Sequence, residues 1–225
     1  MWNNDNELFS LMKRKLFSAV VGDIMDTMGL VNQFLSPAIR PLQKDMVVVG
    51  RAFPVVEADV GSTAIPKEIA DKPFGLMLEA LDDLCQNEVY ICTGASPDYA
   101  LWGEIMTARA QVLGAGGAVL DGYSRDTPGV LKTGFPTFSY GAYSQDQMVR
   151  GKVVNYRVPI KMGNVVINPG DIVFGDFDGV CIIPQKNEQE IIELALDKAS
   201  TEKIVHKKIL EGMSACEAFI EYGVM

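Results

Sequence analysis

The sequence has a single histidine, no paired cysteines and no nucleotide-binding loop. One histidine, His206, cannot build a three-histidine zinc cage, and its place on the polar side of a long helix argues against a Ser-His-Asp triad. The segment 114–117 is glycine-rich, but it follows a helical pattern instead of a strand and matches no phosphate-binding motif. The cysteines fit no zinc spacing and are expected to be free thiols: Cys85, Cys92, Cys181 and Cys216.

Segments that would direct the chain to a membrane are also missing. No apolar run approaches the roughly 20 residues that a membrane-spanning helix needs. Residues 1–5 lack the positively charged and apolar regions of a signal peptide. We therefore expect a cytoplasmic protein with no membrane partner.

Positive charge is scarce. The chain has 20 Lys and Arg against 29 Asp and Glu, a formal net charge of -9. Such a chain repels phosphate backbones, so we expect no nucleic-acid partner.

What the sequence does contain is enough apolar residues, 48% of 225, to bury a full core. Helical spacing and β-rich runs alternate through the middle of the chain, short strands with Gly-containing turns follow after Gly151, and a long helix closes it. This order predicts one α/β layered domain over residues 1–225 with a mixed sheet. The expected helices are 7–29 in one or two pieces with Ser18 as a cap, 67–84, 100–113 and 187–210; the main expected strands are 46–56, 89–92, 118–120, 135–140, 153–160, 165–167, 171–174 and 180–183.

The most informative motif is Gly103-Glu104 followed, after residues 105–124, by Arg125-Asp126. The intervening residues read as a helix and a buried strand, which brings two carboxylates and a guanidinium to one end of the sheet. This is where α/β proteins place ligand sites. Two acids beside one arginine make a poor apolar core but a good oxygen-ligand metal site with an anion clamp.

Arg125 and Asp126 have two interpretations. They could form a structural ion pair at a strand end. Alternatively, Asp126 could bind a hard divalent cation such as Mg²⁺, which often takes only one or two protein carboxylates and keeps several waters. Arg125 would then hold a substrate carboxylate, because its planar fork matches a carboxylate bidentately.

Glu104 also has two interpretations. It could simply be a first-turn glutamate favoured by the helix dipole. It could instead be an acid that hydrogen-bonds to metal-bound water. The free backbone N–H groups of Gly103, Glu104, Ile105 and Met106 would face an anion at the same helix start.

The other polar candidates have adequate structural explanations. Asp178 lies in an Asp-Gly pair that is typical of a hairpin turn. Asp176 is expected to have a structural role. Asp23 and Asp26, three residues apart, fit a solvated helix face or a cap. Nothing around Lys132 indicates the apolar pocket that a Schiff-base lysine needs.

The chain resembles the RraA-like family, which contains class II 4-hydroxy-4-methyl-2-oxoglutarate / 4-carboxy-4-hydroxy-2-oxoadipate aldolases and the regulator of ribonuclease activity A. The family pattern is an acid, twenty residues and Arg-Asp, here Glu104 and Arg125-Asp126. The likeness covers roughly residues 15 to 212. The other matching residues are Asp23, Gly50-Arg51-Ala52, Asn168-Pro169-Gly170-Asp171 and Gly175-Asp176-Phe177-Asp178-Gly179-Val180.

The resemblance implies an α/β/α swivelling fold, like the phosphohistidine domain, in a homotrimer or a hexamer with active sites between subunits. It also implies that Asp126 binds Mg²⁺ or Mn²⁺ directly, that Arg125 contacts a pyruvate moiety and that Glu104 touches metal-bound water. A glutamate from the last helix of the neighbouring subunit would join them, and Glu202 is the best match. The characterised aldolases commonly have Asp where this chain has Glu104, a change of one methylene that bears on the substrate.

The function that the resemblance implies is metal-dependent cleavage of a small 4-hydroxy-2-oxo acid to pyruvate and a second carbonyl product, with oxaloacetate decarboxylation as a side activity. The alternative is a non-catalytic regulator that binds a ribonuclease or helicase partner. Some members carry a demethylmenaquinone methyltransferase-like label, but the sequence has no Gly-rich S-adenosylmethionine loop after a first strand.

Overall fold

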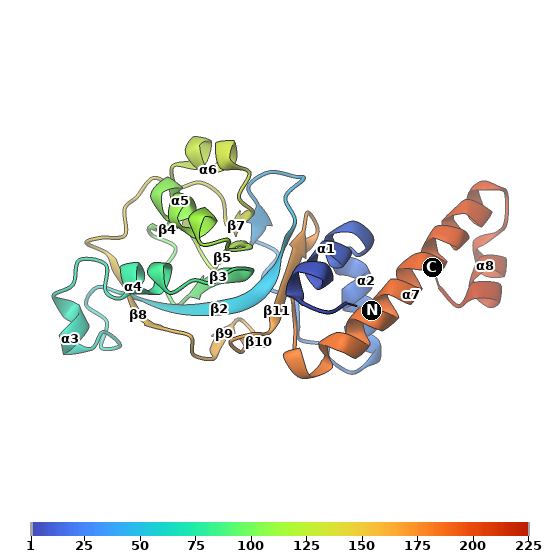
Figure 1. The fold of residues 1–225 in the computed structure, drawn as a ribbon, viewed down its shortest axis with the longest axis horizontal. Helices are drawn as coiled ribbons and strands as arrows, with labels where there is room; N and C mark the ends of the chain where they lie inside the picture. The colour runs from blue at the N-terminus through green and yellow to red at the C-terminus, as the bar shows by residue number, and fades with distance from the viewer. Residues whose placement is uncertain (1, 225) are drawn as a thin grey trace.

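A long central strand, β2 (Val48–Asp59), organises the fold of residues 2–224, which the computed structural model describes (Figure 1). One edge of β2 pairs in parallel with β3 (Glu88–Thr93). The other edge pairs antiparallel first with β11 (Ile172–Asp176) and then with β8 (Gly151–Tyr156). β2 is buried along most of its length, as its run of valines and other apolar residues predicts.

The remaining strands are β1 (Arg40–Pro41), β4 (Ala100–Trp102), β5 (Gly117–Leu120), β6 (Tyr123–Ser124), β7 (Thr137–Ser139), β9 (Ile160–Met162), β10 (Val165–Ile167) and β12 (Gly179–Ile183). Four of these eight strands, β1, β5, β7 and β12, complete the predicted mixed sheet. The eight-stranded sheet has the order β1-β7-β5-β3-β2-β11-β12, with β8 added on β2. β2, β3, β5 and β7 run parallel, whereas β1, β8, β11 and β12 make antiparallel pairs. Two small sheets, β9–β10 and β4–β6, lie outside it.

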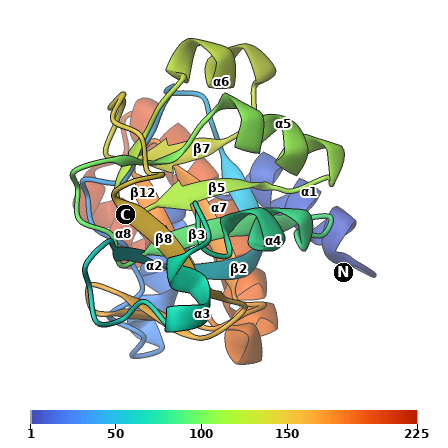
Figure 2. The ribbon, with the colours of Figure 1, turned by 90° about the vertical axis from the view of Figure 1, so that its left-hand side faces the viewer.

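The helices gather in two groups at opposite ends of the molecule (Figure 1), and Figure 2 views one of these ends. The helices are α1 (Asp5–Lys15), α2 (Ser18–Thr27), α3 (Lys67–Ala70), α4 (Met77–Asp82), α5 (Glu104–Val112), α6 (Thr127–Thr133), α7 (Glu188–Leu210) and α8 (Ala215–Tyr222). α1, α2 and α7 pack beside β11 and β12, while α4, α5 and α6 lie at the other end, and α7 extends away from them. No helix within residues 2–224 is long and apolar enough to cross a bilayer.

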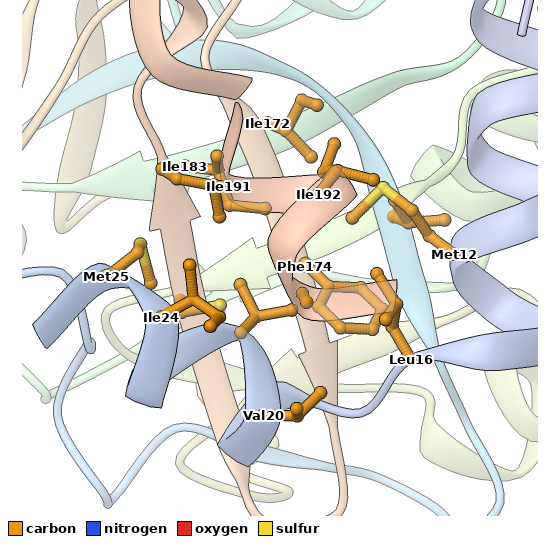
Figure 3. Packing of buried hydrophobic residues seen from close by; sticks show 14 of the residues in the cluster. Met12, Leu16, Val20, Ile24, Met25, Ile172, Phe174, Ile183, Ile191 and Ile192 are labelled. Atoms are coloured by element: carbon orange, nitrogen blue, oxygen red, sulfur yellow. The ribbon is translucent and has the colours of Figure 1, made fainter. Parts of the chain in front are cut away.

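The alternating side chains of β2 divide the core. Val49 faces a cluster that α1, α2 and α7 share with β11 and β12, and Figure 3 shows Phe174 between Leu16 and Ile192 within it. Phe53 and Val55, on the same face, pack under α4 and α5. The opposite face, which includes Val48, is covered by the β9–β10 hairpin and neighbouring segments. Both faces of the sheet are therefore buried.

Two predicted helices differ from those observed. The expected helix 67–84 is two short helices, because Gly75 takes a left-handed φ of +64° and its Cα lies so close to Val153 O that a Cβ would be only 2.2 Å away. The expected helix 100–113 begins only at Glu104, because Ala100 and Trp102 pair in parallel with β6. The consequence is that Gly103 joins a buried strand to a helix start.

Asp176 has the structural role expected of it. The prediction that Ser18 caps α2 was wrong. The two carboxylate oxygens of Asp176 accept hydrogen bonds from Ser18 N and Ser18 Oγ, both at 2.6 Å. Ser18 is the first helical residue, and Phe17 holds the cap position without a side-chain hydrogen bond. The acid that binds the helix start comes from β11, which is distant in the sequence. A carboxylate at this end satisfies free N–H groups and complements the helix dipole.

Candidate functional site

A pocket of about 220 Å³ lies where β4, the start of α5 and the start of α6 meet. Among its lining residues are Gly103, Ile105, Met106, Arg125 and Asp126, five of the residues that the sequence predicts for the site. β4 and β6 pair in parallel, so their ends place the glycine and the Arg-Asp pair side by side. Whether these residues bind a substrate stays a prediction.

Gly103 lets the Asp126 carboxylate come close to the main chain. A Cβ on Gly103 would lie 2.7 Å from Asp126 Oδ2 and 3.4 Å from Arg125 Cγ, so any larger residue would push both side chains away. Asp126 itself has a left-handed backbone, with φ 55° and ψ 30°, just before α6. Non-glycine residues seldom adopt this conformation, and it is often found where function constrains a side chain.

Arg125 lies between two carboxylates. Its Nη1 donates to Asp146 Oδ1 at 2.6 Å, and its Nε lies 3.5 Å from Asp126 Oδ2. Its main-chain N–H donates to Trp102 O at 2.8 Å, which ties the Arg-Asp pair to β4. The Arg125 side chain remains 37% exposed, so part of its guanidinium is available to an anion in the pocket.

The first turn of α5 faces the same pocket. The first intrahelical hydrogen bond runs from Thr107 N to Gly103 O at 3.0 Å, so the N–H groups before Thr107 have no partner inside the helix. Ile105 and Met106 line the pocket beside Gly103. A carboxylate bound here would meet these N–H groups and the positive end of the helix dipole together with Arg125.

Glu104 is exposed on the first turn of α5, and its side chain makes no hydrogen bond or ion pair with any described residue. Its carboxylate lies against Gly129 of α6, where a Cβ would be 2.2 Å from Glu104 Cδ. It is not among the residues that line the pocket. The structure therefore places Glu104 over α6, the helix that begins immediately after Asp126.

Glu202 lies on α7, which extends away from the end of the molecule that carries α5 and α6 (Figure 1). Its ion pair is with Lys198, at 3.8 Å, and Lys198 also reaches Asp23 at 2.5 Å. Within one chain Glu202 does not line the pocket. His206, on the same helix, is exposed as expected.

Asp126 has the free coordination capacity that a hard cation requires. Its side chain is 46% exposed and accepts no hydrogen bond from its own helix. No group of three or more His, Cys, Asp or Glu within residues 2–224 is arranged to hold a metal, which a four-ligand zinc site would need. One or two carboxylates with several waters fit Mg²⁺ or Mn²⁺, so the donors present suit the predicted metal.

The sequence did not reveal Asp146, which binds Arg125, or the pair of Gln147 and Glu57 next to it. Asp146 binds Arg125, and its neighbour Gln147 lines the pocket and donates from Nε2 to Glu57 Oε1 at 2.7 Å. Glu57 is only 2% exposed on β2. The acid within the apolar run of β2 was a visible signal for Glu57, whereas nothing in the sequence marks Asp146 or Gln147.

Burial raises the pKa of Glu57 to about 8, and the nearby Asp59 carboxylate adds to the effect while the Gln147 hydrogen bond opposes it. Glu57 is thus protonated in the folded protein at a pH where it ionises in the unfolded chain. Its contribution to stability is complete below its unfolded pKa and is lost as the pH rises towards about 8.

Replacing Glu57 by Gln is expected to weaken the dependence of the unfolding free energy on pH over this range. A glutamine keeps an acceptor for Gln147 but cannot ionise. Between pH 5.5 and 8 the wild-type protein should lose about 3 kcal/mol of unfolding free energy relative to the Glu57→Gln variant, since one pKa unit is about 1.4 kcal/mol. Urea unfolding of both proteins across this range measures the difference. If the unfolding free energies of the two proteins changed in parallel with pH, the raised pKa of Glu57 would be contradicted.

The comparisons with known proteins identify the family of the chain. The family model described as RraA-like, Aldolase/RraA, matches residues 18–182. A protein of Halalkalibacterium halodurans, provisionally named a 4-hydroxy-4-methyl-2-oxoglutarate aldolase, is 30% identical over 210 residues, covering 92% of this chain and 91% of that protein. The protein DlpA of Legionella pneumophila is 28% identical over 206 residues, covering 91% of this chain but only 32% of DlpA.

Solved structures share the fold. The crystal structure of Streptomyces coelicolor RraAS2, described as an unusual member of the RNase ES inhibitor RraA protein family, has a TM-score of 0.77 at 24% identity, over 92% of this chain and 99% of that one. At this identity the likeness concerns the fold. With the family match over residues 18–182 and the full-length relative, these findings show that the chain belongs to the RraA-like family.

Proposed function

We propose that this protein is a divalent-metal-dependent aldolase that cleaves a 4-hydroxy-2-oxo acid to pyruvate and a second carbonyl compound. One observation carries the proposal: Gly103 allows the Asp126 carboxylate and the Arg125 side chain to lie together at the start of α5, inside a pocket. Membership of a family that includes proteins named as aldolases supports it.

Two sets of donors in the chain can bind the carboxylate and the 2-oxo group of the substrate. The part of the Arg125 guanidinium that its ion pairs leave free can form charge-assisted hydrogen bonds to the carboxylate. The N–H groups before Thr107 complete the anion site. Because these donors are fixed by β4 and α5 before the reaction, they stabilise the negative charge that develops on the pyruvate fragment.

Asp126 is the direct ligand for Mg²⁺ or Mn²⁺ in this proposal. An ion held by Asp126 would supply Lewis-acid stabilisation of the negative charge that develops on the substrate. The left-handed backbone of Asp126 directs the carboxylate towards the pocket, and Gly103, which has no side chain, leaves room for it. Glu104 does not itself line the pocket, so in this proposal the proton of the C4 hydroxyl reaches its carboxylate only through intervening water.

The same site should decarboxylate oxaloacetate. Loss of CO₂ from oxaloacetate leaves the same pyruvate enolate as the aldol cleavage, so the same Arg125 and Asp126 contacts stabilise it. The longer Glu104, where the characterised aldolases commonly have Asp, has no role in this second reaction if its task is to accept the C4 hydroxyl proton.

A homo-oligomer, a trimer or a hexamer, would complete the site. Glu202 cannot reach the pocket of its own chain because α7 extends away from α5 and α6 (Figure 1). A second copy could bring its α7 to the pocket and add a carboxylate that contacts the waters around the metal.

Release of pyruvate, coupled to lactate dehydrogenase, tests the proposal. The substrates are a panel of 4-hydroxy-2-oxo acids and oxaloacetate, each with Mg²⁺ or with a chelator. We expect pyruvate from at least one aldol substrate and from oxaloacetate, in both cases only with the metal. Absence of turnover from the whole panel, together with stable association with a ribonuclease or helicase, would instead identify a non-catalytic regulator.

A further inference from the structure

Glu57 is an acid buried within the apolar strand β2, where only 2% of its surface is exposed. Among the described residues, the hydrogen-bond partner of its side chain is Gln147, whose Nε2 donates to Glu57 Oε1 at 2.7 Å. Gln147 is itself only 5% exposed, so the contact is made and buried within one chain, whatever the assembly of that chain. An apolar side chain would be buried here at lower cost, which points to a role for the polar contact beyond stability.

Gln147 lies in the middle of a compact segment, residues 145–151, that leads from the pocket into β8. The start of the segment is tied to β4, because Gln145 O accepts a hydrogen bond from Ala100 N at 2.9 Å. Its end is tied back to the middle, because Gln147 O accepts from Gly151 N, also at 2.9 Å. The side-chain contact with β2 therefore holds the middle of the segment against the sheet.

Gly151 lets this segment close over the buried acid. A Cβ on Gly151 would collide with Glu57 Oε1 and with the hydroxyl oxygen of Tyr99, so a larger residue would push the segment away from β2. The Tyr99 hydroxyl donates to Asp59 Oδ1 at 2.9 Å, which fixes the other side of this contact. The segment thus packs directly on polar groups of β2.

Asp146, next to Gln147, links the segment to Arg125. Its Oδ2 accepts a hydrogen bond from Met148 N at 3.0 Å, within the segment, and its Oδ1 accepts from Arg125 Nη1 at 2.6 Å. Because one carboxylate oxygen is fixed to the segment, the other lies where the segment places it. The direction of the guanidinium therefore follows the position of residues 145–151.

We infer that Glu57 is a positioning residue for the proposed site: the hydrogen bond that it accepts from Gln147 fixes residues 145–151, and Asp146 on this segment orients the guanidinium of Arg125. Glu57 does not line the pocket, so it acts through these residues and not on a substrate. A displacement of about 1 Å at such a site can cost on the order of 10²-fold in rate. What Arg125 does in the pocket rests on the proposed function, whereas its positioning is a property of the folded chain.

Two substitutions of Glu57 separate the hydrogen bond from the packing. Glu57→Met keeps the length of the side chain but removes the acceptor, so kcat/KM for pyruvate release with Mg²⁺ should fall by about tenfold or more. Glu57→Gln keeps an acceptor for Gln147 and should retain roughly the wild-type value. Equal losses in the two variants would overturn the inference.

Asp171→Asn is the matched control for lost stability. Asp171 is a buried acid, 3% exposed, that accepts a hydrogen bond from Gln185 N at 2.9 Å and does not line the pocket. The substitution should lower the free energy of unfolding and leave kcat/KM unchanged. A loss of kcat/KM equal to that in Glu57→Met would assign the effect to stability alone and would also overturn the inference.

A double-mutant cycle tests whether Glu57 acts through Asp146. Asp146→Ala removes the carboxylate that orients Arg125 and should by itself lower kcat/KM. In the Asp146→Ala background, Glu57→Met should cost less than about twofold more, because residues that act through one another have non-additive effects. A further loss as large as that in the wild-type background would show that Glu57 acts by another route and would overturn the inference.

Amide hydrogen exchange, which needs neither substrate nor metal, separates this inference from the proposed function. The N–H groups of Met148, Arg150 and Gly151 donate to acceptors within the segment and report on its order. Exchange over residues 145–151 should be about fivefold or more faster in Glu57→Met than in the wild-type protein, and unchanged in Glu57→Gln.

Gln147→Met breaks the same hydrogen bond from the other side and leaves β2 unaltered. It should accelerate the same exchange, so the test holds even if Glu57→Met does not fold. Unchanged exchange in Gln147→Met, or in folded Glu57→Met, would overturn the inference whether or not pyruvate is released. Accelerated exchange in both variants of a protein that releases no pyruvate would support the inference and overturn the proposed function alone.

Discussion

Replacement of Arg125 by alanine should lower kcat/KM for pyruvate release by about 10²–10³-fold, the effect that removal of one preorganised donor to a developing oxyanion commonly has. Arg125 is the one cationic side chain in the described part of the pocket, so no other side chain there can take over its role. Stability should change little, because its ion pairs are more than a third exposed and such pairs contribute about 0–1 kcal/mol. The measurement is the coupled assay together with urea unfolding.

Two further variants make this result specific. Arg125→Lys keeps the charge but loses the planar fork, so it should recover only part of the activity. Arg109→Ala is the matched control, since Arg109 lies on α5, is 42% exposed and pairs with Asp82 away from the pocket. Full activity in Arg125→Ala, or an equal loss in Arg109→Ala, would contradict the role of Arg125.

Replacement of Asp126 by asparagine should weaken Mn²⁺ binding by roughly 10²-fold and reduce metal-dependent turnover in proportion. The change removes the charge of the one carboxylate that lies in the pocket free of hydrogen bonds. The fold should persist, because asparagine tolerates the left-handed backbone at this position. Isothermal titration with Mn²⁺ measures the binding directly.

Asp82→Asn provides the comparison for this variant. Asp82 is an exposed acid at the end of α4 that pairs with Arg109, so its loss also removes one negative charge. Mn²⁺ affinity should be unchanged in Asp82→Asn. Equal affinities in the wild-type protein and in Asp126→Asn would mean that the cation binds elsewhere.

The local features of the site could be predicted from the sequence because they depend on neighbouring residues. The glycine before Glu104 and the Arg-Asp pair after a buried strand mark a helix start and a strand end, and parallel strands bring such ends together. In the structure Gly103, Arg125 and Asp126 line one pocket, whereas Glu104 does not. The mixed sheet followed from strands that alternate with helices and then form hairpins.

Features that depend on distant contacts could not be predicted in this way. Glu57 and Gln147 meet across 90 residues, and Asp176 caps α2 from β11, 158 residues away from Ser18. Gly75 ends the predicted helix 67–84 because of a close approach to β8 that no local pattern records. In each case a tertiary contact fixes a group whose neighbours in the sequence look ordinary.

A crystal structure of the protein soaked with Mn²⁺ and pyruvate, with anomalous diffraction to locate the metal, tests the central claim most directly. The account predicts an anomalous peak within coordination distance of the Asp126 carboxylate and a pyruvate carboxylate in contact with Arg125. A metal peak remote from Asp126, or pyruvate bound without contact to Arg125, would contradict it.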